Sequence, residues 1–191
     1  MELTDRFSRA LQYACMLHAR QKRKGTDIPY IAHVLAVTSI VLENGGGEDE
    51  AVAALLHDAI EDQGGDTVRK EILQRFGDRV AAIVEGCTDS DTIPKPPWRQ
   101  RKEAYIKHIG TAPYSVRLVS AADKLHNARA ILNDYITHGE DVWNRFNGGK
   151  KGTLWYYRTL VNAYKTSAGL PFLQELERVV QELERRAGAA T

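Results

Sequence analysis

Residues 53–62 read Ala-Ala-Leu-Leu-His-Asp-Ala-Ile-Glu-Asp, and this stretch decides the fold prediction. Apolar residues fill its first half, which is typical of a buried helix, and two polar pairs follow at helical spacing. Because residues four apart lie on one face of a helix, His57 should stack with Glu61 and Asp58 with Asp62. The stretch therefore predicts one continuous helix that turns an imidazole and three carboxylates towards a common cavity.

Helical patterning also covers the rest of the sequence. In residues 7–17, apolar positions recur at helical spacing behind Thr4, a favourable N-cap. Glycines and prolines separate the segments, and we find no alternating strand pattern with hairpin turns. We therefore predict an all-α fold, a multi-helix bundle forming a single domain over residues 1–191. Further helices are expected around residues 31–42, 66–76, 78–87, 116–131, 155–157 and 173–186.

Some segments are harder to assign. Residues 92–97 contain three prolines, which remove hydrogen-bond donors, so we expect an ordered loop there. Residues 147–152 are basic and glycine-rich; we expect a loop, although it lacks the strand and the Lys-Ser/Thr ending of a P-loop. The β-branched run 116–119 is the most ambiguous between helix and strand. The amphipathic last helix, at about 171–187, could bury against the domain or against a second subunit.

The composition is that of an ordinary globular protein. Hydrophobic residues make up 43% and charged residues 27% of the chain, which argues against disorder. The net charge of +1 gives no global field for nucleic acid or an anionic membrane. No stretch approaches the roughly 20 apolar residues that cross a bilayer, and Cys15 and Cys87 match neither a disulfide framework nor a zinc pattern. We expect a cytoplasmic protein without nucleic-acid or membrane partners.

Four side chains outside the apolar pattern suggest a metal site. They are His33, His57, Asp58 and Asp123, two imidazoles and two carboxylates. This mixed nitrogen and oxygen donor set suits Mn, Fe, Co, Ni or Zn, whereas calcium prefers oxygen alone. Asn127 follows Asp123 by one helical turn and should lie beside it. Crowded carboxylates in a helical core repel one another, and a divalent cation offsets that charge.

Each of these residues has an ordinary structural interpretation when taken alone. His33 on an apolar face is more often a hydrogen-bonded core histidine than a ligand. Glu61 with Asp62 is more often a solvated helix end, and Asp123 could be a buried acid paired with Lys124 or Arg117. Their joint occurrence, in this order and on helices, favours the metal site.

At these residues the sequence resembles a known family. His33, the stretch 53–62 and Ala122-Asp123-Lys124-Leu125-His126-Asn127-Ala128-Arg129 are similar to the HD hydrolase domain of the RelA/SpoT alarmone enzymes. The short length resembles the small alarmone hydrolases, including the animal Mesh1 type. The resemblance covers about residues 7–165, and His-Asp-x-x-Glu-Asp is much more specific than His-Asp alone.

The resemblance implies an HD-type helical domain with Mn²⁺-dependent hydrolysis of ppGpp or pppGpp at the 3′-pyrophosphate, giving GDP or GTP and pyrophosphate. It makes the four residues above the metal ligands, and Glu61 and Asp62 the acid/base and water-positioning pair. Arg23, Lys24 and Asn127 would line the nucleotide site. An alternative for Arg23 and Lys24 is a solvated basic helix end. The chain departs from the family pattern at 25–26 and at Ala130, which weakens the substrate contacts only.

Two other functions remain open. The same metal centre could serve a phosphatase or nucleotidase acting on another nucleotide, such as NADPH or a dNTP, because pocket shape sets this choice. The chain could also be a metal-binding regulatory module with little turnover, although Glu61 and Asp62 argue against that. Homo-oligomerisation is possible.

Overall fold

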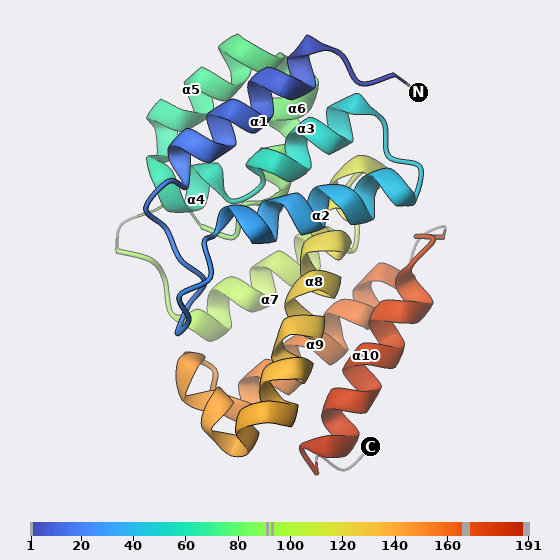
Figure 1. The fold of residues 1–191 in the computed structure, drawn as a ribbon. Helices are drawn as coiled ribbons and strands as arrows, with labels where there is room; N and C mark the ends of the chain where they lie inside the picture. Colours follow the sequence, from blue (N-terminus) through green and yellow to red (C-terminus); the bar gives the residue numbers. More distant parts are fainter. Residues whose placement is uncertain (1, 91, 93, 166–168, 189–191) are drawn as a thin grey trace. The chain divides into compact units, whose positions relative to one another are not determined.

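Helices form the regular secondary structure of the protein (Figure 1). The structure, a computed structural model, describes residues 2–90, 92, 94–165 and 169–188. No β-strand occurs in these ranges, and an isolated bridge pairs Lys22 with Pro29. The all-α prediction is therefore confirmed. None of the helices in the described ranges combines the length and the apolarity that crossing a bilayer requires.

The chain divides into two compact units. The first unit consists of Met1–Pro96 and Ala112–Ala122, and the second of Pro97–Thr111 and Asp123–Thr191. The helices of the first unit are α1 (Asp5–Leu17), α2 (Ile31–Glu43), α3 (Glu48–Leu56), α4 (Ala59–Gln63), α5 (Gly65–Phe76), α6 (Asp78–Cys87) and the beginning of α8 (Tyr114–His138).

Helix α3 is the centre of the first unit. It packs against α1, α2 and α6, and all its residues from Glu50 to Leu56 are buried. A helix that is apolar on all sides is stable only when neighbours cover it all round. The Glu50 carboxylate closes its N-terminus by accepting the Gly47 amide hydrogen at 2.9 Å. The polar residue that follows its C-terminus, His57, is consequently buried as well.

The helix predicted to run unbroken through residues 53–62 is interrupted, so that prediction is wrong in this detail. α3 and α4 are separate elements, with His57 and Asp58 between them. The His57 Nδ1 lies 2.8 Å from the Ala54 carbonyl oxygen, which in an unbroken helix accepts the amide hydrogen of residue 58. Helical hydrogen bonding then resumes, because the Asp62 amide donates to the Asp58 carbonyl oxygen at 2.9 Å. The four-residue spacing of the two carboxylates thus survives the break.

The second unit is arranged around α9. Its helices are α7 (Trp98–Ile109), the rest of α8, the 3-10 helix η1 (Gly139–Arg145), α9 (Gly149–Lys165) and α10 (Leu173–Arg186). α9 packs against α7, η1 and α10. Helix α10 buries Leu176, Val180 and Leu183, and its Glu184 accepts a hydrogen bond from Arg158 Nε of α9 at 2.9 Å. The last helix therefore packs within its own unit, the first of the two alternatives left open by the sequence.

The stretch expected as a basic glycine loop, residues 147–152, belongs largely to a helix, so the loop prediction is wrong. Residues 149–152 form the first turn of α9. The Trp98 ring packs against this turn: a Cβ added to Gly148 would lie 2.6 Å from the ring, and one added to Gly152 would lie 3.1 Å from it. Glycine is present here because the backbone approaches a tryptophan closely.

Most other predicted boundaries are close to those observed, but α8 and α9 extend well beyond the predicted ranges 116–131 and 155–157. Thr4 caps α1 by accepting the Arg6 amide hydrogen at 3.2 Å. The described proline-rich residues 94–97 form no helix, as expected, while Ile93 lies outside the described residues. The ambiguous run 116–119 is helical and belongs to α8.

A close helix contact in the first unit allows a test of this packing. A Cβ added to Gly86 of α6 would lie 2.7 Å from both methyl carbons of Val116 in α8. We expect Gly86→Ala to lower the free energy of unfolding by about 1–3 kcal/mol, because overpacking outweighs the better helix propensity of alanine. Urea denaturation measures the change. In combination with Val116→Ala the loss should be less than additive; additive losses would show that the two residues do not press on each other.

Candidate metal centre

Two buried histidines and an aspartate converge within the first unit. His33 lies in the first turn of α2, and His57 and Asp58 join α3 to α4. The Asp58 Oδ2 is 2.9 Å from His57 Nε2 and 3.6 Å from His33 Nε2. The three ligand atoms all lie within 4.8 Å of one another, and the histidines are only 1% and 2% exposed. The structure thus brings together the three predicted ligands that belong to this unit.

These residues fit a shared metal ion. Ligand atoms about 2.1 Å from an ion and about 90–110° apart lie about 3.0–3.4 Å from each other, close to the observed separations. The Ala54 carbonyl oxygen can only accept, so the His57 Nδ1 that faces it at 2.8 Å carries the ring proton. The Nε2 of the neutral ring then turns a lone pair towards the Asp58 carboxylate. Only a cation between them, or an added proton, makes that contact attractive.

Tyr30 also contacts Asp58. Its hydroxyl donates to Asp58 Oδ2 at 2.5 Å. Its ring meets the His33 ring edge-on, with centroids 5.3 Å apart, and stacks on the His18 ring at 5.0 Å. Sequence reasoning assigned Tyr30 no role. Its position three residues before His33 is compatible with their ring contact, but no spacing in the sequence predicts its hydrogen bond to Asp58.

The two acidic side chains of α4 are held by different partners. Asp62 Oδ2 accepts a hydrogen bond from Gln21 Nε2 at 2.8 Å. Glu61 pairs with Lys95 Nζ at 2.7 Å and also accepts the Asp89 amide hydrogen at 3.3 Å. Sequence reasoning predicted neither Gln21 nor Lys95 as a site residue. Both contacts join segments that are far apart in the sequence, and no helical spacing predicts them.

The Asp62 carboxyl group has a raised pKa. Desolvation by burial is the largest cause and the nearby Asp58 charge the second, and together they raise the pKa of Asp62 to about 6, against the lowering effect of the Gln21 hydrogen bond. The residue is exposed as a whole, so the desolvation comes from protein atoms packed around the carboxyl group on its inner side. A carboxylate with a pKa near neutrality is well suited to accept a proton.

The fourth predicted ligand, Asp123, belongs to the second unit, where it lies on α8. Its Oδ1 accepts a hydrogen bond from Asn127 Nδ2 at 2.5 Å, so the predicted contact across one turn is confirmed. Lys124 pairs with the other carboxylate oxygen, which is the ion-paired alternative that the sequence left open. Burial alone would lower the pKa of Lys124, but Asp123 outweighs it, and the pKa is raised well above its usual value. The role of Asp123 as a ligand stays a prediction.

The basic pair Arg23 and Lys24 lies in the connection between α1 and α2. Because α1 ends at Leu17, the alternative that these residues form the last turn of a helix is wrong. The Arg23 guanidinium lies 5.9 Å from the centroid of the Tyr30 ring, whose hydroxyl contacts Asp58. Lys24 is exposed. Of the two basic residues predicted to contact the substrate, the structure therefore brings Arg23 close to the cluster.

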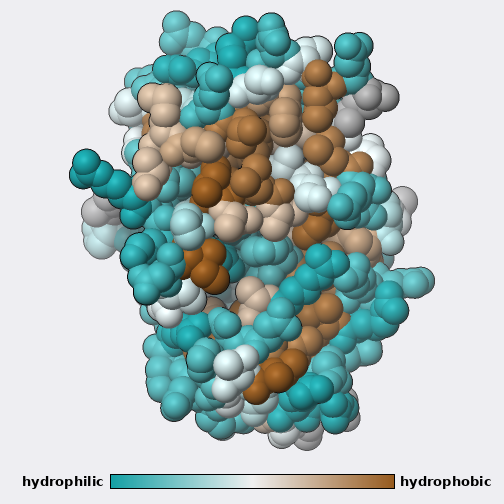
Figure 2. Space-filling view, in the orientation of Figure 1, coloured by the Kyte–Doolittle hydropathy of each residue, from teal (hydrophilic) through white to brown (hydrophobic). Residues whose placement is uncertain are grey.

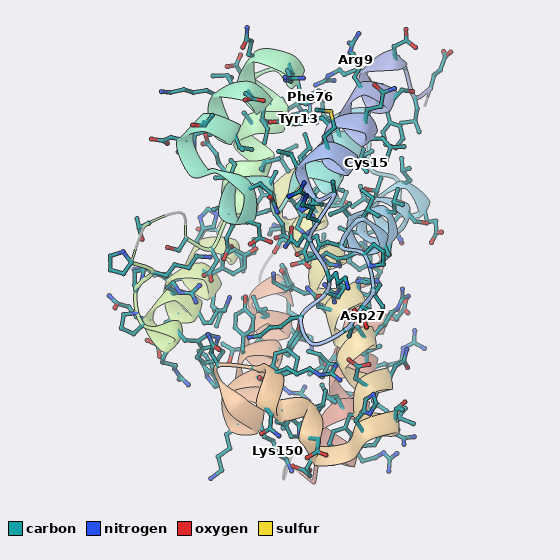
Figure 3. The ribbon with its side chains drawn as sticks, turned by 60° about the vertical axis from the view of Figure 1, so that its left-hand side comes forward. Arg9, Tyr13, Cys15, Asp27, Phe76 and Lys150 are labelled. Carbon is teal, nitrogen blue, oxygen red and sulfur yellow. The ribbon has the colours of Figure 1, made fainter. Side chains whose placement is uncertain are left out.

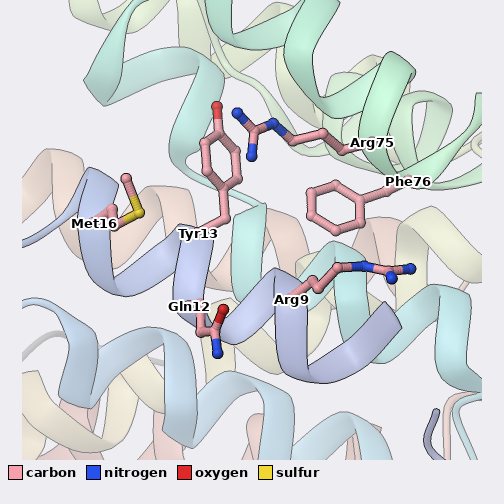
Figure 4. A pocket seen from close by; sticks show the side chains of 6 residues that line it. All are labelled: Arg9, Gln12, Tyr13, Met16, Arg75 and Phe76. Carbon is pink, nitrogen blue, oxygen red and sulfur yellow. The ribbon is translucent and has the colours of Figure 1, made fainter. Parts of the chain in front are cut away.

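A cavity of about 330 Å³ lies elsewhere in the first unit, between α1 and α5 (Figure 4). Arg75 lies over the Tyr13 ring, 4.7 Å from its centroid, and the Tyr13 hydroxyl donates to Glu71 at 2.8 Å. Figure 3 shows Tyr13 and Phe76 between these helices. In Figure 2, hydrophobic side chains gather on the surface of the same unit. None of the predicted site residues lines this cavity. The lining residues are Arg9, Gln12, Tyr13, Met16, Arg75 and Phe76.

A helical protein in which two buried histidines meet an aspartate beside two further acidic residues is typical of metal-dependent hydrolases. The family model described as HD domain matches residues 10–154, and the chain belongs to the HD domain family. The chain is similar to a guanosine-3′,5′-bis(diphosphate) 3′-pyrophosphohydrolase from Xenopus tropicalis, with 42% identity over 63% of this chain and 66% of that protein. The human protein of that name is 37% identical over 63% of this chain and 66% of its own length. The chain thus spans slightly less than two thirds of these relatives.

A solved structure supports the fold. It is described as a metazoan orthologue of SpoT that hydrolyses ppGpp, and it covers 100% of this chain and 99% of its own, with a TM-score of 0.76. The sequence identity is 24%, so this likeness shows the shared helical fold. The predicted family membership is therefore confirmed, both by the family model and by the sequence relatives.

The raised pKa of Asp62 predicts a pH-dependent effect on stability. The folded-state pKa of about 6 exceeds the ordinary value of 3.8, so the folded protein binds more protons than the unfolded chain between these values, and this residue makes stability fall as pH rises. In the metal-free protein, the stability of Asp62→Asn relative to the parent should therefore increase from about pH 4 to about pH 7.5. Urea denaturation at both pH values measures this.

The matched control is Asp27→Asn, because the Asp27 side chain is 96% exposed. It removes a carboxylate with almost no desolvation, and the loss of its ion pair with Lys22 changes stability with pH in the opposite direction. If Asp62→Asn gave the same stability difference at both pH values, the desolvation of Asp62 would be refuted.

Proposed function

We propose that the chain is a metal-dependent 3′-pyrophosphohydrolase of guanosine alarmones, which converts ppGpp or pppGpp to GDP or GTP and pyrophosphate. The observation that carries the proposal is the convergence of His33, His57 and Asp58, with Glu61 and Asp62 one turn further along. The relatives that bear the name of this activity support the choice of substrate. We place this activity in the cytoplasm.

The metal would be held by His33, His57, Asp58 and Asp123, and Mn²⁺ suits this mixture of nitrogen and oxygen donors. When bound, a divalent ion offsets charge on the phosphoryl group and lowers the pKa of a coordinated water. The chain itself prepares the ligands. Ala54 fixes the tautomer of His57 through its carbonyl oxygen, and the Tyr30 hydroxyl orients Asp58.

In the proposed reaction, a water oxygen bonds to the phosphorus attached to the 3′ oxygen, and the bond between that phosphorus and the 3′ oxygen breaks. Asp62 takes the proton that the water loses, which fits its pKa of about 6. The proton held by Asp62 then passes, directly or through a water molecule, to the 3′ oxygen, which leaves as a hydroxyl group while pyrophosphate departs. Glu61, held by Lys95, would position the water.

The cationic and amide side chains would bind the nucleotide. Arg23 can contact a phosphate with two parallel hydrogen bonds or stack on guanine, and Lys24 would act as a point charge. Asn127 would add an amide contact from α8. Positioning and charge stabilisation account for most of the catalysis of phosphoryl transfer, so these contacts would contribute to rate as well as affinity.

A hydrolysis assay tests the proposal. The purified chain with Mn²⁺ should release pyrophosphate from ppGpp, and should turn over NADPH and dNTPs far more slowly. Phosphate release from NADPH or a dNTP alone would move the function to another nucleotide. Inertness towards all three substrates, in a protein that binds Mn²⁺, would leave only the regulatory alternative.

Two variants separate catalysis from metal binding. We expect Asp62→Ala to lose at least about 100-fold in kcat while binding Mn²⁺ as the parent does, because it removes the proton acceptor. Asp123→Ala should lose Mn²⁺ affinity, measured by calorimetric titration. Asp27→Ala, which removes an exposed carboxylate, is the control for both. Full activity of Asp62→Ala would refute its role, and unchanged Mn²⁺ affinity of Asp123→Ala would remove it from the ligands.

A further inference from the structure

Three polar side chains lie next to the acidic residue Asp62 and take no part in the proposed reaction: His18, Gln21 and Gln63. Gln21 Nε2 donates to Asp62 Oδ2 at 2.8 Å. On its other side, Gln21 Oε1 lies 2.6 Å from His18 Nδ1 and accepts a hydrogen bond from Gln63 Nε2 at 2.5 Å. The Gln21 amide is therefore engaged through both its nitrogen and its oxygen.

We infer that His18 and Gln21 are a positioning pair that fixes the direction of the Asp62 carboxylate. This inference rests on the proposed function, because it treats Asp62 as the proton acceptor. The pair touches no reacting atom in the structure and acts through Asp62. Two hydrogen bonds between neutral donors and their acceptors link the buried His18 imidazole to Gln21 and Gln21 to the Asp62 carboxylate. We call this pair of hydrogen bonds the relay.

The direction of each hydrogen bond follows from the chemistry of its ends. The Asp62 carboxylate can only accept when ionised, so the Gln21 amide must turn its NH₂ group towards it. Gln21 Oε1 then faces two donors, and His18 Nδ1 has to carry the ring proton. A flipped amide would set the Gln21 oxygen against the ionised carboxylate. Gln63 Nε2 lies 3.4 Å from His18 Nδ1 and 2.5 Å from Gln21 Oε1, so the shorter contact with Gln21 is its hydrogen bond.

The backbone holds the relay in place. The His18 amide donates to the Ala14 carbonyl oxygen at the end of α1, and the Gln21 amide donates to the His18 carbonyl oxygen at 3.1 Å. The Gln21 carbonyl oxygen in turn accepts the Tyr30 amide hydrogen at 2.9 Å. Both residues of the pair are thus fixed in the main chain as well as in the side chain, as an orienting group requires.

Burial of His18 suggests that its role is specific. The residue is only 2% exposed, and its Nε2 has no hydrogen-bond partner among the described residues. An unsatisfied buried nitrogen costs stability, so an apolar residue would serve the core better. The ring also stacks on Tyr30, which holds Asp58. One buried histidine therefore contacts the partner of each aspartate, Tyr30 for Asp58 and Gln21 for Asp62.

The relay also distinguishes the two acids of α4. Glu61 is paired with the Lys95 ammonium group, a full positive charge, whereas Asp62 receives a neutral amide donor. A neutral donor orients a carboxylate while stabilising its charge far less than a cation does. The Gln21 amide therefore orients the Asp62 carboxylate without a cation bonded to it, which favours Asp62 over Glu61 as the proton acceptor.

The kinetic test uses variants that differ in one hydrogen bond. Gln21→Met keeps the side-chain length and removes both bonds, and should lower kcat by about 10- to 100-fold with little change in KM or in Mn²⁺ affinity. Gln21→Glu, which sets a carboxylate against Asp62, should also shift the pH–rate profile upwards. The matched control is Gln181→Met in α10, whose exposed amide likewise donates to a carboxylate, Glu177, at 3.4 Å.

Replacing His18 by asparagine or by glutamine tests whether the hydrogen bond from His18 Nδ1 to Gln21 is needed for activity. The amide nitrogen of asparagine reaches the position of Nδ1, and that of glutamine reaches the position of Nε2. His18→Asn should therefore retain more kcat than His18→Gln, with Mn²⁺ affinity unchanged in both. Equal activity of the two variants, loss of Mn²⁺ affinity in both, or full activity of Gln21→Met would overturn the inference.

A nuclear magnetic resonance measurement tests the hydrogen bond between Gln21 and Asp62 independently of the proposed activity. In the metal-free protein, the ¹³C signal of the Asp62 carboxyl group should move in Gln21→Met and stay in place in Gln181→Met. If the parent protein hydrolysed none of the three nucleotides, the proposed function would fail while this signal still reported the relay. An Asp62 signal that is identical in the parent and in Gln21→Met would overturn the relay whatever the activity.

Discussion

The Asp58 carboxylate is the constraint on which the rest of the site depends. One of its oxygens faces two buried imidazole nitrogens, His57 at 2.9 Å and His33 at 3.6 Å, and accepts a hydrogen bond from Tyr30. The His57 Nδ1 donates its proton to the Ala54 carbonyl oxygen, so the His57 Nε2 presents a lone pair to the Asp58 carboxylate. A divalent cation between these two groups would remove the repulsion, so the arrangement of the side chains favours binding of a cation.

The surrounding structure follows from holding these groups in place. Helix α3 is buried from Glu50 to Leu56, and it ends where the His57 side chain forms a hydrogen bond with the Ala54 carbonyl oxygen. The resulting break turns Asp58 towards the histidines, and the immediate return to helical bonding keeps Asp62 one turn away. The connection from α1 to α2 then contributes Gln21 and Tyr30, which orient the two aspartates.

Much of this could be predicted from the sequence, for identifiable reasons. Helical periodicity and capping residues predicted the helices, and the four-residue spacing predicted the contact between Asn127 and Asp123. The break at His57 could not be predicted, because it depends on a side chain competing with the backbone. The glycines at 148–152 were misassigned because their cause is the distant Trp98 ring. The partners of the α4 acids were missed, since Gln21 and Lys95 meet them only in the folded chain.

The central claim is that the buried imidazoles of His33 and His57 ligate a divalent ion. Pulsed electron paramagnetic resonance of the Mn²⁺-loaded protein measures this directly, because nitrogen nuclei bound to the ion modulate the electron-spin echo. We predict nitrogen couplings from two imidazoles that change when histidine is labelled with ¹⁵N and decrease in His57→Gln. Bound Mn²⁺ with no histidine nitrogen coupling would contradict the account.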